Sequence, residues 1–402
     1  MTLCLSKKES IQDLDISVFN TVNDIPALHW NTVIQDKNIY LTLGYLKSIE
    51  HSLSFDMVFR YLVFYTAEKI PVSVAVVQFL SFMDKDRKDE EQLCAIRKKI
   101  KNSFLASSGI QVMSCGSPFA CGENGFMYTN DITESEAYYN LAKGLIALQK
   151  AEKNINHAPV IVLKDFWPET ISTLSAMKKA GFKDFMIDVN MVMKIHASWN
   201  TFDDYLFSMV TKFRTKAKSA FNKSASLQIV NFQIEDLIAH KATIERLYKS
   251  VVDKSAFNFG ALNGDAFVQL KENLGDQFTI KGYFLNQELV GFSSAFIFDG
   301  IVDANYVGID YNVNQSFALY QRMLYDYVDL AISTGSKELR LGRTAEEIKS
   351  TIGAVPVKMM LYIRHQSIVK NTLLKPVFGA ITPRTFEQRN PFKADFNANN
   401  KL

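Results

Sequence analysis

The sequence predicts an α/β protein with mixed α+β sheets, built as two tandem domains from an internal duplication. Its 402 residues are too many for one ordinary domain. The order helix, β-hairpin, helix, strand, helix, strand is expected twice, and the two hairpins match loosely in sequence at 63–72 and 282–290. The boundary is expected near residues 196–200. The predicted parts are domains at 1–197 and 198–370 and a polar C-terminal tail at 371–402.

In the first domain, apolar residues at helical spacing alternate with β-branched and aromatic runs of strand length. Gly181 follows the helix at 170–179 in the C-cap role. A charge-dense segment at 84–101 is expected to form an exposed loop that runs into a surface helix, with partner binding as the alternative. The expected elements are a helix at 40–50, strands at 57–64 and 72–80, a helix at 134–153, a strand at 158–163, a helix at 170–179 and a strand at 185–195.

The second domain repeats this order. Its hairpin turns at Asn286-Gln287, and its long helix ends near Gly335. The expected elements are a helix at 265–274, strands at 278–285, 289–298 and 301–308, a helix at 316–333, a strand at 338–341, a helical turn at 345–350 and a closing strand at 357–364.

A basic amphipathic segment at 202–225 lies between the two domains and predicts one helix with a cationic face. Two interpretations stay open. The face is either simply solvated, or it is a surface for an anionic ligand or lipid headgroup. The cations are Lys212, Arg214, Lys216, Lys218 and Lys223, interleaved with Leu206, Val210, Phe213 and Phe221.

Composition and charge narrow the class of protein. A content of 48% hydrophobic and 22% charged residues is typical of a globular chain. The net charge of +3 does not indicate global attraction to nucleic acid. Because the sequence shows neither a signal-peptide core nor an apolar run of about 18 residues, a cytoplasmic protein is expected, with peripheral contact to the inner face of the membrane as an option.

Two residue classes add to this. Four cysteines in this length fit reduced thiols rather than a disulfide framework. Thirty Phe and 16 Tyr indicate either a well-filled core or an aromatic-walled site for an apolar substrate.

The block at 282–356 carries the clearest indication of function. A hairpin leads to a third strand, a polar turn that opens a long helix, another strand, and a Gly-Arg corner. Its distinctive residues are Asp303, Tyr306, Gly308, Asp310, Tyr311, Tyr320, Gly342, Arg343 and Lys349. This block resembles the acyl-transfer half of the GNAT superfamily, in the branch of Fem-type peptidoglycan aminoacyltransferases and Acetyltransf_6 proteins. The resemblance is strongest over 200–365.

The resemblance implies tandem GNAT-like domains and an N-acyltransferase that moves a group other than an aminoacyl group from a thioester to an amine. The co-substrate would be acyl-CoA or an acyl-carrier protein, and no permanent cofactor is expected. The aromatic richness and the basic helix favour a lipid-like amine and a role in lipid metabolism.

Donor binding in such a site needs two splayed strands and a helix N-terminus that faces phosphate. The strands at 301–308 and 357–364 are the expected pair, and 310–316 is the expected phosphate-facing turn. Gly308, Asn314 and Ser316 are the candidate cofactor-binding residues, through close backbone approach and helix capping. The family's usual loop, Gln/Arg-x-x-Gly-x-Gly/Ala, has no counterpart in 308–318. This departure argues against binding of free coenzyme A and suits a carrier-protein thioester or an aminoacyl-tRNA donor.

Acyl transfer also needs a base for the amine and an acid for the leaving thiolate. Asp303 and Tyr306 are the candidates, although three positions on a regular strand put them on opposite faces unless a bulge intervenes. Arg343, after a strand-ending glycine, is the third candidate catalytic residue, for a carboxylate or phosphate. The alternative to a catalytic role for Arg343 is a structural one, in a salt bridge to Glu346 or Glu347. The candidate substrate-binding residues are Tyr311, Tyr320 and Lys349.

Two other functions remain as alternatives. One is Fem-type aminoacyl transfer from a charged tRNA in peptidoglycan synthesis, and the other is a non-catalytic GNAT-fold binding module. The Gly-rich loop at 115–125 with Cys115 and Cys121 is expected to border the cleft between the domains, without a cysteine nucleophile. The six histidines show no metal-ligand spacing.

Overall fold

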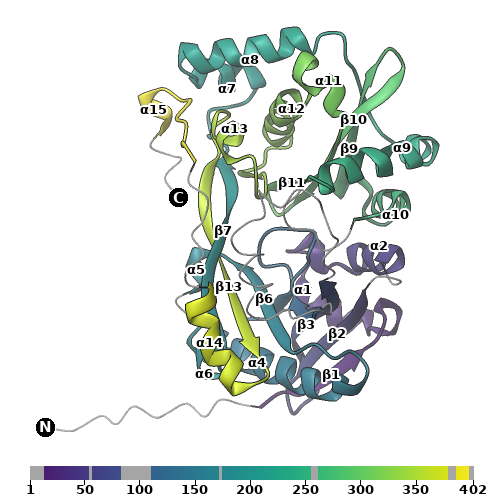
Figure 1. Cartoon of the computed structure of the whole chain (residues 1–402), viewed down its shortest axis with the longest axis vertical. Coiled ribbons are helices and arrows are strands. Elements are labelled where there is room, and N and C mark those ends of the chain that lie inside the picture. The colour runs from purple at the N-terminus through teal and green to yellow at the C-terminus, as the bar shows by residue number, and fades with distance from the viewer. Residues whose placement is uncertain are drawn as a thin grey trace, which may run out of the picture.

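The structure is a computed structural model of the chain, and it describes residues 13–53, 57–82, 110–171, 174–254, 261–378 and 386–397. Within these ranges the strands form one 13-stranded mixed sheet with helices on both faces (Figure 1). The predicted α/β class is therefore confirmed. The charged segment expected at 84–101 falls outside the described residues.

The first half follows the predicted order, preceded by a strand and a helix that periodicity did not indicate. Its elements are β1 (Asp15–Phe19), η1 (Val22–Asp24), α1 (Ala27–Ile34), η2 (Ile39–Leu41), α2 (Leu43–Leu53), β2 (Val58–Tyr65), β3 (Pro71–Phe82), β4 (Ile110–Cys115), β5 (Phe126–Tyr128), α4 (Glu134–Ala151), η4 (Glu152–Asn154), β6 (Val160–Phe166), α5 (Pro168–Ile171), α6 (Ser175–Lys179) and β7 (Lys183–Lys194). The strands β1 to β4 run antiparallel in sequence order, and β6 then pairs with β4 in parallel. The helix between them, α4, begins at a capping box in which Thr133 and Glu136 satisfy each other's backbone amides.

The second half repeats this arrangement. Its elements are α7 (Phe202–Ser208), α8 (Thr211–Lys223), β8 (Gln228–Asn231), α9 (Ile234–Val252), α10 (Gly264–Leu274), η5 (Gly275–Gln277), β9 (Phe278–Leu285), β10 (Glu288–Phe298), β11 (Ile301–Ile309), α11 (Tyr311–Phe317), α12 (Leu319–Ser333), β12 (Glu338–Arg340), α13 (Glu346–Ser350), β13 (Val355–His365), α14 (Ile368–Phe378) and α15 (Ala394–Asn397). The strands β8 to β11 run antiparallel, and β12 pairs with β11 in parallel across α12, as β6 does with β4. The same unit is thus present twice.

The two units exchange their last strands. The strand β7 of the first half pairs with β12 of the second, β13 of the second pairs with β6 of the first, and β7 and β13 pair with each other. The reciprocal exchange joins both units into one continuous sheet, with β7 and β13 at its centre (Figure 1). It also overturns one expectation. The strands expected at 301–308 and 357–364 are not neighbours, because β12 and β7 lie between them.

Two helices that the sequence predicts as continuous are broken. The helix expected at 316–333 divides at Ala318, whose φ of 49° places it in the left-handed region. The helix expected at 202–225 divides after α7, where Val210 donates its backbone N–H to Pro391 O at 2.9 Å. In both cases a tertiary contact or cap outweighs the helical periodicity. No helix in the described ranges is long and apolar enough to cross a membrane.

The main hydrophobic core belongs to both halves. Helices α1 and α2 of the first half and α9 and α10 of the second pack into one cluster, with α2 against α10. Aromatic rings fill its centre, where Tyr40, Phe296 and Tyr306 lie with edge-to-face contacts. The described part of the C-terminal tail also packs on the protein, since Phe392 is buried against Trp199, with ring centres 5.3 Å apart.

Candidate functional site

A β-bulge brings the two candidate proton-transfer residues to the same face of the sheet. Between the pairs Ser293–Val307 and Ala295–Ala304, the strand β11 contains one residue more than β10. The extra residue shifts the alternation of side chains, so Asp303 and Tyr306 face the same core. Both are 2% exposed.

The bulge is fixed by a side chain of the neighbouring strand. Ser294 Oγ accepts a hydrogen bond from Tyr306 N at 3.2 Å and donates one to Tyr306 O at 3.0 Å. The sequence allowed Asp303 and Tyr306 to share a face only if a bulge lay between them, and the structure contains that bulge.

The first half completes this cluster with Tyr40, on η2. Its hydroxyl donates to Asp303 Oδ2 at 2.6 Å and accepts from Asn305 Nδ2, also at 2.6 Å. The phenol thus stands between a buried carboxylate and an amide of the second half. These two hydrogen bonds join the first unit to the second.

A second tyrosine extends the cluster toward the Gly-rich loop. Tyr45 Oη, on α2, lies 3.5 Å from Tyr306 Oη and 3.2 Å from Ser117 Oγ. A row of hydroxyl groups therefore leads from β11 to the loop that follows β4.

Burial and neighbouring groups shift the pKa values of Asp303 and Tyr306. Burial raises the pKa of Asp303 to about 6, although nearby Arg340 and the hydrogen bond from Tyr40 lower it. Burial raises the pKa of Tyr306 well above its ordinary value, as does the neighbouring hydroxyl of Tyr45. Near neutral pH, Asp303 can take up and release a proton while Tyr306 remains a donor.

The third candidate, Arg343, pairs with a carboxylate that the sequence did not single out. Its guanidinium forms an ion pair with Asp165 at the end of β6, whereas Glu347 pairs with Arg389. Asp165 is 1% exposed and also lies 2.7 Å from Lys164 Nζ. Burial raises the pKa of Asp165, but Arg343 and Lys164 outweigh it and hold the pKa below its usual range.

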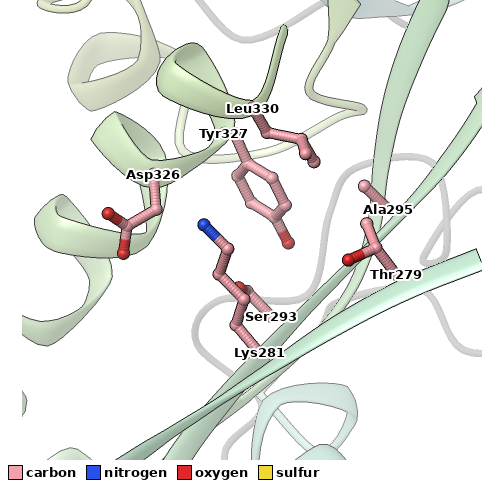
Figure 2. A pocket seen from close by; sticks show the side chains of 7 residues that line it. All are labelled: Thr279, Lys281, Ser293, Ala295, Asp326, Tyr327 and Leu330. Carbon is pink, nitrogen blue, oxygen red and sulfur yellow. The ribbon is translucent and has the colours of Figure 1, made fainter. Parts of the chain in front are cut away.

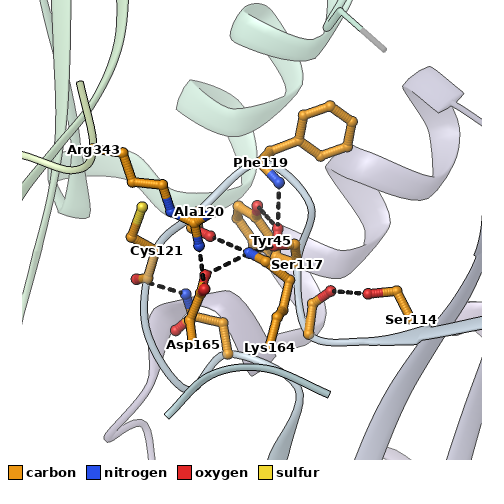
Figure 3. Close-up of polar contacts among 11 residues, drawn as sticks. Tyr45, Ser114, Ser117, Phe119, Ala120, Cys121, Lys164, Asp165 and Arg343 are labelled. Carbon is orange, nitrogen blue, oxygen red and sulfur yellow. Dashed lines mark hydrogen bonds and ion pairs between the residues drawn. The ribbon is translucent and has the colours of Figure 1, made fainter. Parts of the chain in front are cut away.

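The same lysine ties this ion pair to the Gly-rich loop (Figure 3). Lys164 Nζ donates to the carbonyl oxygens of Ser117 and Ala120, both at 2.7 Å. The loop therefore lies between the Arg343 corner and the tyrosine cluster. As expected, it borders the junction of the two halves.

Lys349 supports the corner from inside the protein. It is 4% exposed, and its Nζ donates to Arg343 O at 2.6 Å. The candidate substrate-binding Lys349 thus lies beside Arg343, with its ammonium group on the backbone carbonyl.

The two cysteines of the loop are poor nucleophiles in this setting. Burial raises the pKa of Cys115 to about 12, and it raises the pKa of Cys121 despite the nearby Arg343. In the part of the chain that the structure describes, no three Cys, His, Asp or Glu residues are grouped as metal ligands.

Two candidate donor-binding residues, Asn314 and Ser316, lie in the segment that follows β11. The expected turn at 310–316 is the short helix α11 instead, because Asp310 caps it by accepting from Asn312 N at 2.9 Å. Asn314 Oδ1 accepts from Tyr320 N at 2.9 Å and so caps α12 from the preceding helix. Ser316 lies within α11.

The other donor-side and substrate-side candidates have structural contacts. A Cβ at Gly308 would lie 2.3 Å from the Phe292 ring, so the close approach there is made by a side chain of the core. Tyr311 is 37% exposed, with Lys254 Nζ 3.1 Å from its ring centre. Burial raises the pKa of Tyr320.

Sequence reasoning missed the residues of the first half that meet this site, namely Tyr40, Tyr45, Ser117, Lys164 and Asp165. One signal was present. The loop after β4 was singled out for its glycines, and Ser117 belongs to it. The others are ordinary core or strand-end residues, and only the packing of the two units gives them a place in the site.

Two hollows lie on the opposite face of the second half, between α12 and the strands β9 and β10. The larger, of about 410 Å³, has Lys271, Lys281 and Asp329 in its wall. The smaller holds about 10 Å³, and Figure 2 shows Lys281 reaching between Asp326 and Tyr327 there. Neither hollow is lined by Asp303, Tyr306 or Arg343.

Comparison with known proteins gives structural likeness only. No protein-family model and no curated protein matches the chain. The similar solved structures include FemX, with 13% identity, a TM-score of 0.48 and coverage of 83% of this chain and 93% of that one. The structure of L-PGS from Bacillus licheniformis has 11% identity, a TM-score of 0.45 and coverage of 83% and 96%. A tandem GNAT protein from the clavulanic acid biosynthesis pathway has 9% identity, a TM-score of 0.47 and coverage of 88% and 99%.

These values are too low to transfer an activity or a substrate to the chain. The fold rests on its own strand order, with the parallel pairs β4–β6 and β11–β12 in equivalent places of the two units. The chain has the α/β fold with a duplicated unit that its sequence predicts.

Proposed function

We propose that the protein is an N-acyltransferase that moves an acyl group from a thioester to an amine at the Asp303–Tyr306 cluster. One observation carries the proposal. The bulge in β11 places an aspartate of raised pKa and a protonated tyrosine on one face, where β11 and β12 stop pairing after Asp303–Arg340. Parallel strands that separate beside an acid and a base are what acyl transfer in this fold requires.

In the proposed reaction the amine nitrogen attacks the thioester carbonyl carbon. The C–N bond forms, the nitrogen loses a proton to the Asp303 carboxylate, and the C–S bond breaks. The departing thiolate takes the proton of the Tyr306 hydroxyl, and exchange with solvent restores both groups. No further reactant is needed.

The donor is proposed to be acyl-CoA or an acyl-carrier protein, with the second favoured. The segment 308–318 lacks the glycines that cradle a pyrophosphate, and Asn314 already occupies the Tyr320 amide at the start of α12. A carrier-bound pantetheine has one phosphate and depends less on such a cradle. Aromatic rings around Tyr306, from Tyr248 and Phe267, support an acceptor amine with an apolar part.

Substrates must reach groups that are almost fully buried in this conformation. We propose that the contacts Tyr40–Asp303 and Asp165–Arg343 part locally to admit substrates and form again around them, while the continuous sheet stays intact. This would explain why both units contribute polar groups to one cluster.

The test is amide formation by the purified full chain with long-chain and short-chain acyl-CoA, acyl-carrier protein and amine acceptors. Thiol release and product mass are measured together. We expect Asp303→Asn and Tyr306→Phe to lower kcat/KM by about 10²- to 10⁴-fold. The matched controls Asp299→Asn, in the exposed β10–β11 turn, and Tyr65→Phe, in the same core but with its hydroxyl on His29, should stay near wild type.

Other outcomes overturn the proposal. Transfer from aminoacyl-tRNA with none from any thioester would make the protein a Fem-type transferase. A protein that forms no amide with either donor, yet co-purifies with a ligand in native mass spectrometry, would be a binding module.

A further inference from the structure

The helix α8 presents a cationic surface at one end of the molecule. It carries five cations and no acidic residue, in a chain whose net charge is +3. Figure 1 shows α8 lying across one end of the molecule's longest axis. We call Lys212, Arg214, Lys216, Lys218 and Lys223 the α8 cations.

The apolar side of α8 is already used by the protein. Phe213, Ala217 and Ala220 are buried against the second half. The four lysines are exposed and Arg214 is half-buried. The helix therefore cannot insert an apolar face into another molecule, and its free surface is purely polar and cationic.

Helical geometry arranges these cations in two rows. Lys212, Lys216 and Lys223 lie along one edge of the exposed face, and Arg214 and Lys218 lie along the other. Between the rows runs a crest of short, exposed polar side chains, Thr215, Ser219 and Asn222. Because the polar side chains between the rows are short, the longer lysine and arginine side chains of both rows can reach the same flat surface.

Neighbouring residues do not neutralise the rows. None of the α8 cations forms an ion pair with a described residue. The helix α11, which packs against α8, has no charged residue, and Asp326 of α12 is bound to Arg322. On α7, Asp204 is held in the capping box with Thr201, whereas the other acidic residue, Asp203, is exposed and forms no ion pair with the α8 cations.

An aromatic residue stands at the end of α7, next to α8. Phe207 is 68% exposed, and Lys393 Nζ lies 4.0 Å from its ring centre. An exposed phenylalanine beside cations is a common feature of segments that lie on lipid headgroups.

We propose that α8 docks the protein on an anionic lipid bilayer, with the two rows on headgroup phosphates and Phe207 at the headgroup boundary. The flat reach of two rows and the exposed phenylalanine favour a bilayer over RNA. The contact is electrostatic and reversible, because the helix has no free apolar face. This proposal is independent of the proposed catalysis.

The experiment is co-sedimentation of the full chain with vesicles of phosphatidylcholine, with and without phosphatidylglycerol. We expect binding only to the anionic vesicles, with a loss on adding salt. The variant Lys212→Gln/Lys216→Gln/Lys223→Gln should reduce the partition constant by about tenfold or more. Phe207→Ser should reduce it further when it is added to this variant.

The matched control removes three exposed lysines elsewhere, as Lys150→Gln/Lys249→Gln/Lys358→Gln, and should leave binding near wild type. Circular dichroism checks that both variants are folded. An equal loss of vesicle binding in the two triple variants would overturn the proposal, because binding would then depend on the net charge of the protein and not on α8. It would also be overturned by no binding of wild type to anionic vesicles, or by α8-dependent binding to a short RNA in its place.

Discussion

The hydroxyl of Tyr40 donates a 2.6 Å hydrogen bond to the carboxylate of Asp303, 263 positions away in the chain. The same hydroxyl accepts from Asn305 at 2.6 Å. A phenol of the first unit is thus held between two polar groups of the second, inside their common core. The acidity of the candidate base therefore depends on a residue outside its own unit.

Removing this hydroxyl should move the acid limb of the pH–rate profile. The hydrogen bond from Tyr40 lowers the pKa of Asp303, which burial has raised to about 6. Without it the carboxyl holds its proton to higher pH, so Tyr40→Phe should shift the acid limb of kcat/KM upward and lower activity below neutral pH. Activity at high pH should change less.

The matched control is Tyr61→Phe. Tyr61 donates to Glu50 at 2.6 Å in the same hydrophobic core, so it has the same chemistry away from the cluster. It should cost stability without moving the pH profile. An identical profile in wild type and Tyr40→Phe would separate Tyr40 from the chemistry.

The raised pKa of Asp303 also predicts a pH dependence of stability. An aspartate in the unfolded chain ionises near pH 3.9, whereas the folded protein delays ionisation to about 6. The stabilising contribution of the protonated group is complete below about pH 4 and is lost as the pH rises through 6.

Asp303→Asn cannot ionise, so its unfolding free energy relative to wild type should rise by about 3 kcal/mol across this window. Urea unfolding of both proteins from below pH 4 to above pH 6 measures this difference. A relative stability of the variant that falls with pH would mean that the site favours the carboxylate.

Arg343 and Asp165 should be strongly coupled. Arg343→Ala leaves the buried Asp165 carboxylate with Lys164 as its remaining cation, and we expect a loss of about 3–5 kcal/mol. Adding Asp165→Asn should recover part of that loss, which a double-mutant cycle measures. The control Arg246→Ala, on the exposed face of α9, should stay within about 0.5 kcal/mol.

The same cycle separates structure from catalysis. If Arg343 acts only through the ion pair, kcat/KM should fall in Arg343→Ala together with the free energy of unfolding. Both quantities should then recover in the double variant Arg343→Ala/Asp165→Asn. If Arg343 binds substrate, kcat/KM should stay low although Asp165→Asn restores stability. Additive effects of the two substitutions would contradict the ion pair itself.

The sequence predicted local structure well because local patterns determine it. The turn at Asn286-Gln287 and the strands on both sides of it were identified from β-branched and aromatic runs, and the order of elements from their repetition. The need for a bulge between Asp303 and Tyr306 also followed from strand alternation alone. These features depend on neighbours within a few residues.

The exchange of β7 and β13 could not be predicted in this way. It depends on pairings such as Val192 with Val355, between segments that are far apart in sequence and equally apolar. The exchange places the two units against each other, and so it decides that Tyr40 and Asp165 meet Asp303 and Arg343. Sequence patterns could therefore name only candidate residues of the second unit, because the contacts from the first unit depend on this exchange.

Gly308 offers a test between a donor-binding and a packing role. A Cβ at this position would lie 2.3 Å from Phe292 Cε1 and 2.7 Å from Leu247 Cβ, so Gly308→Ala overfills the core and should cost about 1–3 kcal/mol. The smaller side chain of Phe292→Leu should relieve the clash, so the double variant should be more stable than the sum of the single losses. Thermal unfolding of the four proteins measures the coupling, and the KM for the thioester, taken well below the unfolding temperature, should stay unchanged. A raised KM in Gly308→Ala without loss of stability would instead place Gly308 against the donor, because the added methyl group would then displace substrate and not Phe292.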